Sequence, residues 1–155
     1  MKLSAQEEFG IRCLMSIAKN GSMTIPTLAS KEGISQSHVA KILALLKRRG
    51  YITSTRGQIG GYALARSADK LFIKDILTSL GGNIYRGDFC ERFSGQETEC
   101  VHMDDCSIHP LWITIQSAID RALTGMTLDD LVDPKAGINV RVYNGGRSQK
   151  AVMVD

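Results

Sequence analysis

The chain has 155 residues, of which 43% are hydrophobic, and its formal net charge is +3. This length accommodates one domain, or a small domain with an added element. Apolar runs fall short of the roughly 20 residues that a membrane-spanning helix needs, and the initial MKLSAQEEFG lacks the apolar core of a signal peptide. We therefore expect a cytoplasmic protein with no membrane partner.

The basic residues are unevenly distributed along the chain. Every charged residue from Lys41 to Arg66 is basic, and this basic block consists of Lys41, Lys47, Arg48, Arg49, Arg56 and Arg66. A basic segment without acidic residues is typical of a surface that binds a polyanion.

A first helix is predicted from Leu3 to Lys19. Ser4 followed three residues later by Glu7 fits a capping box at its start. Cys13 lies among apolar residues at helical spacing, so we expect it to pack in the core rather than to bind a ligand.

The next segment has the layout of a helix–turn–helix. A short helix is predicted from Ile25 to Glu32, and a longer helix from Gln36 to Arg49. In this motif the second helix enters the major groove of DNA, with its first turns facing base edges. A solvated face of a core helix is the alternative interpretation of this segment alone. The side chains predicted to contact bases or phosphates here are Gln36, Ser37, His38 and Lys41.

A β-hairpin is predicted directly after this helix. Tyr51 to Thr55 is rich in β-branched residues, and the glycine-rich RGQIGG turn leads to a returning strand. A hairpin in this place is a wing, and Arg56 at its tip is well placed for the minor groove or for adjacent phosphates. The glycine spacing fits neither a dinucleotide fingerprint nor a P-loop.

The stretch from Cys90 to His109 concentrates metal-ligating side chains. Nine residues separate Cys90 from Cys100, five separate Cys100 from Cys106, and two separate Cys106 from His109. Thiolates and imidazoles are ligands of soft or borderline metals and of iron–sulfur clusters. The intervening residues are polar and cannot bury a core of their own, so a bound inorganic centre is the expected source of order. A mobile loop with incidental cysteines is the alternative.

Helices are predicted on both sides of this cysteine-rich loop. One runs from Leu71 to Leu80 and another, after Pro110, from Leu111 to Leu123, with a last helical turn from Thr127 to Val132. The long helix carries an apolar stripe, which favours the same helix of a second copy as its partner and so a twofold-symmetric DNA site. Folding back onto its own domain is the alternative. The stripe consists of Leu111, Trp112, Ile115, Ile119, Ala122 and Leu123.

Several of these motifs together resemble one family of proteins. The pieces are MKLS at the start, GISQSHVAKIL in the second helix of the helix–turn–helix, RGQIGGYAL in the wing, three cysteines before a long helix, and TLDDLV after it. Over Met1 to Val132 they resemble the Rrf2 family of winged-helix transcriptional regulators, which includes IscR, NsrR and RirA. The resemblance implies a homodimeric DNA-binding regulator whose loop carries an iron–sulfur cluster.

The resemblance also implies a set of cluster ligands. CSIHPLW resembles the IscR type, in which three cysteines and a histidine hold a 2Fe–2S cluster, and these ligands correspond here to Cys90, Cys100, Cys106 and His109. The nine-residue first gap departs from the family pattern. Glu8 lies where NsrR-like members place an aspartate that reaches the cluster of the other subunit. The alternative is therefore a 4Fe–4S cluster with Glu8 of the partner chain as fourth ligand.

Other uses of the same donors stay open. Three cysteines and a histidine are a valid zinc set, although no Cys-x-x-Cys pair is present. The cysteines can also form disulfides under oxidant, as a thiol switch without a cluster. We do not expect an enzyme, since no nucleophile–base pair stands at a recognisable spacing and no small-molecule substrate is evident.

The sequence thus predicts a mostly α-helical fold with a small β-hairpin wing, a winged helix–turn–helix followed by a long C-terminal dimerisation helix. The expected parts are a DNA-binding domain (1–83), a cluster-binding loop (84–109), a dimerisation helix with a short terminal helix (110–133) and a disordered tail (134–155). The predicted function is a homodimeric regulator of transcription that binds double-stranded DNA and is switched by a cluster sensing iron, redox state or nitric oxide. Its predicted DNA contacts are Gln36, Ser37, His38, Lys41, Lys47, Arg56 and Gln58.

Overall fold

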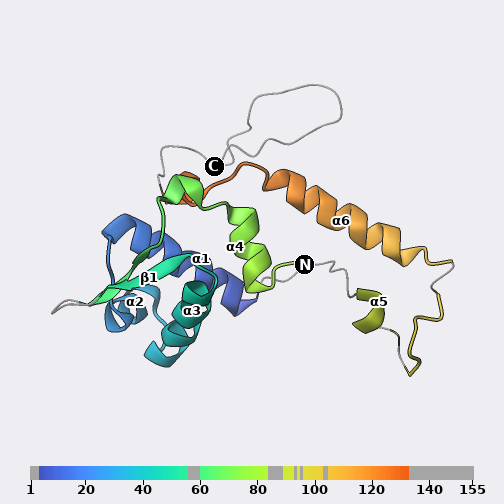
Figure 1. The fold of residues 1–155 in the computed structure, drawn as a ribbon, viewed down its shortest axis with the longest axis horizontal. Helices are drawn as coiled ribbons and strands as arrows, with labels where there is room; N and C mark the ends of the chain where they lie inside the picture. The colour runs from blue at the N-terminus through green and yellow to red at the C-terminus, as the bar shows by residue number, and fades with distance from the viewer. Residues whose placement is uncertain are drawn as a thin grey trace.

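The computed structural model describes residues 4–55, 60–83, 89–92, 94, 96–102 and 105–132. Helices dominate, and one antiparallel hairpin follows the third helix (Figure 1). The elements are α1 (Ala5–Asn20), α2 (Ile25–Glu32), α3 (Gln36–Arg48), β1 (Ile52–Thr55), β2 (Gly61–Leu64), the 3-10 turn η1 (Ala68–Lys70), α4 (Ile73–Leu80), α5 (Phe89–Arg92), α6 (Ile108–Ala122) and α7 (Leu128–Val132). Each of the described helices is too short or too polar to cross a membrane.

Local signals in the sequence set the boundaries of the first helices. Ser4 and Glu7 form the predicted capping box of α1, in which the Ser4 N–H donates to Glu7 Oε2 at 2.7 Å. The Thr24 side chain accepts from the Thr27 N–H at the start of α2. Gly33 ends α2 in the left-handed conformation at φ 68°, where a residue without Cβ is favoured. The predicted layout of a helix–turn–helix is therefore confirmed.

The hairpin pairs β1 with β2, with Ile52 opposite Leu64 and Thr55 opposite Gly61. Met23, in the connection between α1 and α2, adds an isolated antiparallel bridge to Tyr62. Its two backbone hydrogen bonds measure 3.0 and 2.8 Å. The hairpin is thus attached to the helical part of the domain by its own backbone, as expected for a wing.

The core lies between α1, α3, α4 and the base of the hairpin. The predicted packing of Cys13 is confirmed, because the side chain has no exposed surface. Burial, with a smaller contribution from the negative charge of Glu32, raises the pKa of the Cys13 thiol to about 12. Besides Cys13, the largest fully buried side chains of the core are Leu14, Ile17, Leu28, Val39, Leu43, Leu46, Ile52, Leu71, Ile76 and Leu128.

The last described helix returns to this core. Leu128 of α7 is fully buried, and its N–H donates to the Leu71 carbonyl at 2.8 Å. The Ile73 N–H donates to the Met126 carbonyl at 2.9 Å. Because Leu71 and Phe72 take part in this extended pairing, α4 begins at Ile73 and not at the predicted Leu71.

Helix α6 lies apart from the α1–α3 bundle, with α4 between them (Figure 1). It begins at Ile108, earlier than the predicted Leu111, so that Pro110 falls in its first turn, where a missing N–H costs nothing. The structure describes all of its residues, and none of them is buried. Two of its apolar side chains are more than half exposed, Ile108 at 58% and Leu111 at 51%.

Candidate DNA-binding surface and metal-ligating loop

The N-terminal turns of α3 present polar side chains to solvent. The Ser35 side chain caps the helix by accepting the His38 N–H at 3.3 Å. Of the predicted contacts, Gln36, Ser37 and Lys41 are exposed. His38 is half-buried, and its ring meets the edge of the Phe9 ring at a centroid distance of 5.4 Å. Phe9 of α1 therefore orients the ring of His38, one of the four α3 side chains that are predicted to contact bases or phosphates.

The opposite face of α3 fixes which way this surface points. Val39, Ile42, Leu43 and Leu46 are buried against the core. Burial of these positions leaves Lys41, Lys47, Arg48 and Arg49 exposed on the outside of the helix. The exposed side is basic without an acidic neighbour on the helix, which suits a phosphate backbone.

Side-chain hydrogen bonds link the wing to its neighbours. Lys47 Nζ at the end of α3 donates to Ser54 Oγ of β1 at 2.8 Å. The hydroxyl groups of Ser22 and Thr55 lie 3.1 Å apart. The structure thus places Lys47 beside the wing, where its hydrogen bond joins the end of α3 to β1. Two predicted wing contacts, Arg56 and Gln58, lie outside the described residues.

The predicted metal ligands come from three places in the chain. Cys90 lies on α5, Cys100 in the following loop, and Cys106 directly before α6. All three are half-buried and free of disulfides. His109 belongs to the first turn of α6 rather than to the loop, and its N–H donates to Cys106 Sγ at 3.4 Å.

The four predicted ligands have side chains that suit a metal centre, but the structure does not arrange them as one. Thiols and an imidazole suit zinc or an iron–sulfur cluster. Among the described residues, however, no three His, Cys, Asp or Glu side chains gather where they could hold one metal ion. The structure therefore joins Cys106 to the start of α6 but does not bring the four predicted ligands together.

The alternative ligand Glu8 is engaged within its own helix. Its Oε1 atom accepts from Arg12 Nε at 2.8 Å and lies 2.7 Å from Arg12 Nη2. The Arg12 guanidinium in turn lies over the Phe9 ring, 5.6 Å from its centroid. Both partners of this pair are about half exposed, so the pair is screened and contributes little to stability.

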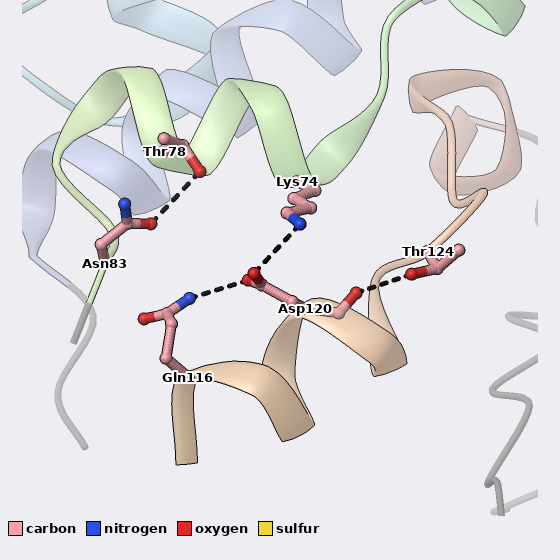
Figure 2. A network of polar contacts seen from close by, with 6 residues as sticks. All are labelled: Lys74, Thr78, Asn83, Gln116, Asp120 and Thr124. Carbon is pink, nitrogen blue, oxygen red and sulfur yellow. Dashed lines mark hydrogen bonds and ion pairs between the residues drawn. The ribbon is translucent and has the colours of Figure 1, made fainter. Parts of the chain in front are cut away.

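A polar network between α4 and α6 was missed by reasoning from the sequence (Figure 2). Asp120 on α6 pairs with Lys74 on α4 at 3.0 Å and accepts from Gln116 at 2.8 Å. Partial burial acts to raise the pKa of Asp120, but the hydrogen bonds from Lys74 and Gln116 outweigh it and lower that pKa. The spacing of Gln116 and Asp120 is a weak signal for a pair on one helix, whereas nothing in the sequence points to Lys74.

The capped helix, its basic outer face and the attached hairpin define a winged-helix DNA-binding protein. Comparison with known proteins narrows this class. The model of the Rrf2 family, described as an iron-dependent transcriptional regulator, matches residues 3–134, and the chain belongs to this family. It is an Rrf2-family transcriptional regulator similar to IscR. Proteins related in this way are regulators and not, in general, enzymes.

Individual relatives cover most of the chain. Protein rrf2 of Nitratidesulfovibrio vulgaris is 33% identical over 135 residues, which cover 85% of this chain and 87% of that protein. The regulator IscR of Pectobacterium atrosepticum is 26% identical over 166 positions, and the match covers 100% of this chain and 98% of that protein.

Solved structures share the fold. CymR of B. subtilis, titled a global cysteine regulator, has a TM-score of 0.66 and 25% identity, and the match covers 85% of this chain and 96% of CymR. T. potens IscR has a TM-score of 0.67 and 23% identity, over 85% of this chain and 86% of that chain. These matches confirm the predicted winged helix–turn–helix.

Proposed function

We propose that this regulator binds operator DNA as a homodimer and that an iron–sulfur cluster in the cysteine-rich loop switches its affinity. The observation that carries the proposal is the pairing, in one chain, of a basic winged-helix surface with three free, half-buried cysteines. The family description as an iron-dependent regulator supports it.

In this proposal the winged helix supplies the contacts to DNA. Gln36 and Ser37 at the start of α3 reach base edges, and His38 is held beside them by Phe9. Lys41 and Lys47 on the outer face of α3 bind phosphates. Arg56 and Gln58 on the wing add contacts at the neighbouring groove.

Cys90, Cys100, Cys106 and His109 would hold the cluster. A bound cluster would supply a centre that gains or loses electrons. Oxidant, nitric oxide or iron shortage would remove this cluster from the protein. An imidazole ligand makes the site sensitive to protonation, in contrast to a site with four thiolates. The loop has to close around the cluster, since its ligands are not gathered among the described residues.

The exposed apolar side chains of α6 support the homodimer. Ile108, Leu111 and Ile113 are between 42% and 58% exposed in the single chain. Large apolar side chains grouped on one helix usually mark a contact with another chain. Ile108 and Leu111, three residues apart, lie on one side of α6. The same helix of a second copy would cover these two and set the distance between the two α3 helices on DNA.

The first test is the cofactor content of protein purified without oxygen. About two iron and two sulfide per chain, with a 2Fe–2S absorption and circular-dichroism spectrum, would support the histidine-ligated form. We expect Cys106→Ala to abolish binding and His109→Ala to alter the spectrum. About four iron, with sensitivity to Glu8→Ala instead, would support the 4Fe–4S alternative.

The second test compares DNA affinity with and without the cluster. The probe is a duplex selected by the protein from a random-sequence pool. We expect the dissociation constant to differ between the two forms and to rise steeply with salt. Protein that is colourless and retains zinc, or that only forms disulfides under peroxide, would contradict the cluster and leave the zinc or thiol alternatives.

A further inference from the structure

Helix α6 is tied to the winged-helix domain by the network of Figure 2. Asp120 Oδ2 lies 3.0 Å from Lys74 Nζ of α4, and Asp120 Oδ1 accepts from Gln116 Nε2 at 2.8 Å. Thr124 Oγ1 donates to the Asp120 carbonyl at 2.9 Å. Both carboxylate oxygens are therefore occupied, and Gln116 holds the carboxylate in the position that faces Lys74.

Packing alone holds α6 weakly in the single chain. The structure describes every residue of α6, and none is buried. Leu123, just past its C-terminal end, packs partly against the core. Apolar contact therefore fixes the end of α6, while the pair between Lys74 and Asp120 restrains the angle at which the helix leaves the domain.

The other end of α6 belongs to the cysteine-rich loop. His109 lies in its first turn, and the Cys106 sulfur accepts the His109 N–H at 3.4 Å. A helix is stiff along its axis, so a displacement of its first turn, where His109 lies, would tilt the whole helix about its C-terminal end. Asp120 lies where that tilt meets the DNA-binding domain.

Helix α4 in turn contacts the helix that supports α3. Gln6 Nε2 of α1 donates to the Leu80 carbonyl at 2.6 Å. Gly10 faces the Leu80 side chain so closely that an added Cβ would lie 2.6 Å from Leu80 Cδ1. One residue before Gly10, Phe9 meets His38 of α3. These contacts form a path from α4 through α1 to α3, along which a shift of α4 would reach the recognition surface.

We propose that Lys74 and Asp120 are positioning residues that hold α6 on α4 and carry the state of the cysteine-rich loop to α3. The proposal rests on the proposed cluster switch, because it names the contact through which that switch acts. The pair is partly exposed, at 43% for Lys74 and 33% for Asp120, so it is weak enough to be made and broken. That property suits a switch better than a permanent link.

The test uses Asp120→Asn, Lys74→Gln and the charge exchange Lys74→Asp with Asp120→Lys. Lys70→Gln on the exposed turn η1 is the matched control. A direct effect of charge on DNA moves affinity in opposite directions for the first two variants, because one raises and the other lowers the net charge. Loss of the contact moves both variants in the same direction.

Two quantities are measured for each variant. One is the ratio of DNA dissociation constants with and without the cluster, on the selected duplex. The other is amide hydrogen exchange of α6 in cluster-free protein. We expect both single variants to bring this ratio about two- to fivefold closer to one and to speed amide hydrogen exchange in α6. The double variant with exchanged charges should restore both quantities in part. Iron and sulfide per chain should stay as in the unmodified protein.

The outcomes separate this proposal from the function on which it rests. Unchanged exchange and an unchanged ratio in both single variants would overturn it. Faster exchange with an unchanged ratio would make the pair merely structural and would also overturn its role in coupling. Should the unmodified protein bind DNA equally with and without its cluster, the proposed switch fails and the coupling fails with it.

Discussion

Gly61 of the wing lies close to the connection between α1 and α2. A Cβ built there would lie 2.7 Å from Ser22 Oγ and 2.9 Å from the Met23 carbonyl oxygen. The second distance involves backbone that is itself hydrogen-bonded to Tyr62, so it cannot move without opening the bridge. The glycine is therefore required by close approach and not by its dihedral angles.

We expect Gly61→Ala to destabilise the protein by about 1–3 kcal/mol, because the added methyl group forces the bridge apart. Chemical denaturation measures the change. The double variant Ser22→Ala with Gly61→Ala is the control. It removes the nearer atom but leaves the Met23 carbonyl, and so it should remain destabilised. Wild-type stability of the single variant would contradict the close approach.

The four cysteines are predicted to differ in reactivity. Burial raises the pKa of Cys13 to about 12, so at pH 8 its thiol stays protonated and shielded. Cys90, Cys100 and Cys106 are half-buried. In metal-free protein we expect iodoacetamide to label these three and to spare Cys13, with all four labelled in urea. Mass spectrometry of peptides reads this directly, and labelling of Cys13 in native protein would contradict its burial.

At the scale of elements, α7, the last described helix, is held by a reciprocal cap. Asp130 Oδ2 accepts from the Thr127 N–H at 2.7 Å and from the Thr127 hydroxyl at 2.8 Å. The Asp130 N–H donates back to Thr127 Oγ1 at 3.4 Å. The hydrogen bond from the backbone, followed by that from the side chain, lowers the pKa of Asp130. This cap positions Leu128 for burial.

Replacement of Asp130 by Asn should cost about 0.5–1 kcal/mol at pH 7, the range for a weakened cap. Because the folded-state pKa is lowered, the carboxylate stabilises the fold above its ordinary pKa of 3.8, and this contribution disappears as the pH falls through the folded value. The difference in the free energy of unfolding between wild type and variant, measured with urea, should therefore become smaller below pH 3.8. Asp129→Asn, at an exposed position in the same turn, is the control and should cost less. A gap that persists at low pH would contradict this origin.

Element boundaries show what local sequence could and could not predict. The capping box of Ser4 and Glu7 and the stop at Gly33 are signals within a few residues, and both were confirmed. The true start of α4 was missed because Phe72 pairs with Thr127, far away in the chain. Local periodicity contains no information about such a partner.

The same contrast holds for the candidate sites. The exposure of Gln36, Ser37 and Lys41 could be predicted because they share one face of a helix whose other face is apolar, and their contact with DNA stays a prediction. The link between Lys74 and Asp120 could not, since it joins helices on opposite sides of the cysteine-rich loop. The resemblance to the IscR type implied a ligand set of Cys90, Cys100, Cys106 and His109, but sequence spacing does not determine how the loop folds.

At the scale of the whole molecule, the proposed dimer makes a direct prediction. Leu111 is 51% exposed, so Leu111→Glu should leave the single chain folded while placing a charge in the contact between two α6 helices. We expect analytical ultracentrifugation to show a shift from dimer to monomer, with weaker DNA binding. Arg121→Glu changes an exposed α6 residue outside the apolar stripe and ten residues from Leu111, and this variant should stay dimeric. A Leu111→Glu variant that remains fully dimeric would contradict this contact.

The backbone pairing around Phe72 and Thr127 has a consequence for the length of the cysteine-rich segment between them. Backbone hydrogen bonds from Leu128 to Leu71 and from Ile73 to Met126 hold together the two ends of the segment that runs from α4 to α6. Once the ends of a chain segment are closed, doubling its length costs only about 0.6 kcal/mol. Residues can therefore be inserted or deleted between the cysteines with little penalty to the DNA-binding domain. The long gap between Cys90 and Cys100 costs the fold little free energy, so the stability of the DNA-binding domain does not constrain the spacing of the cysteines.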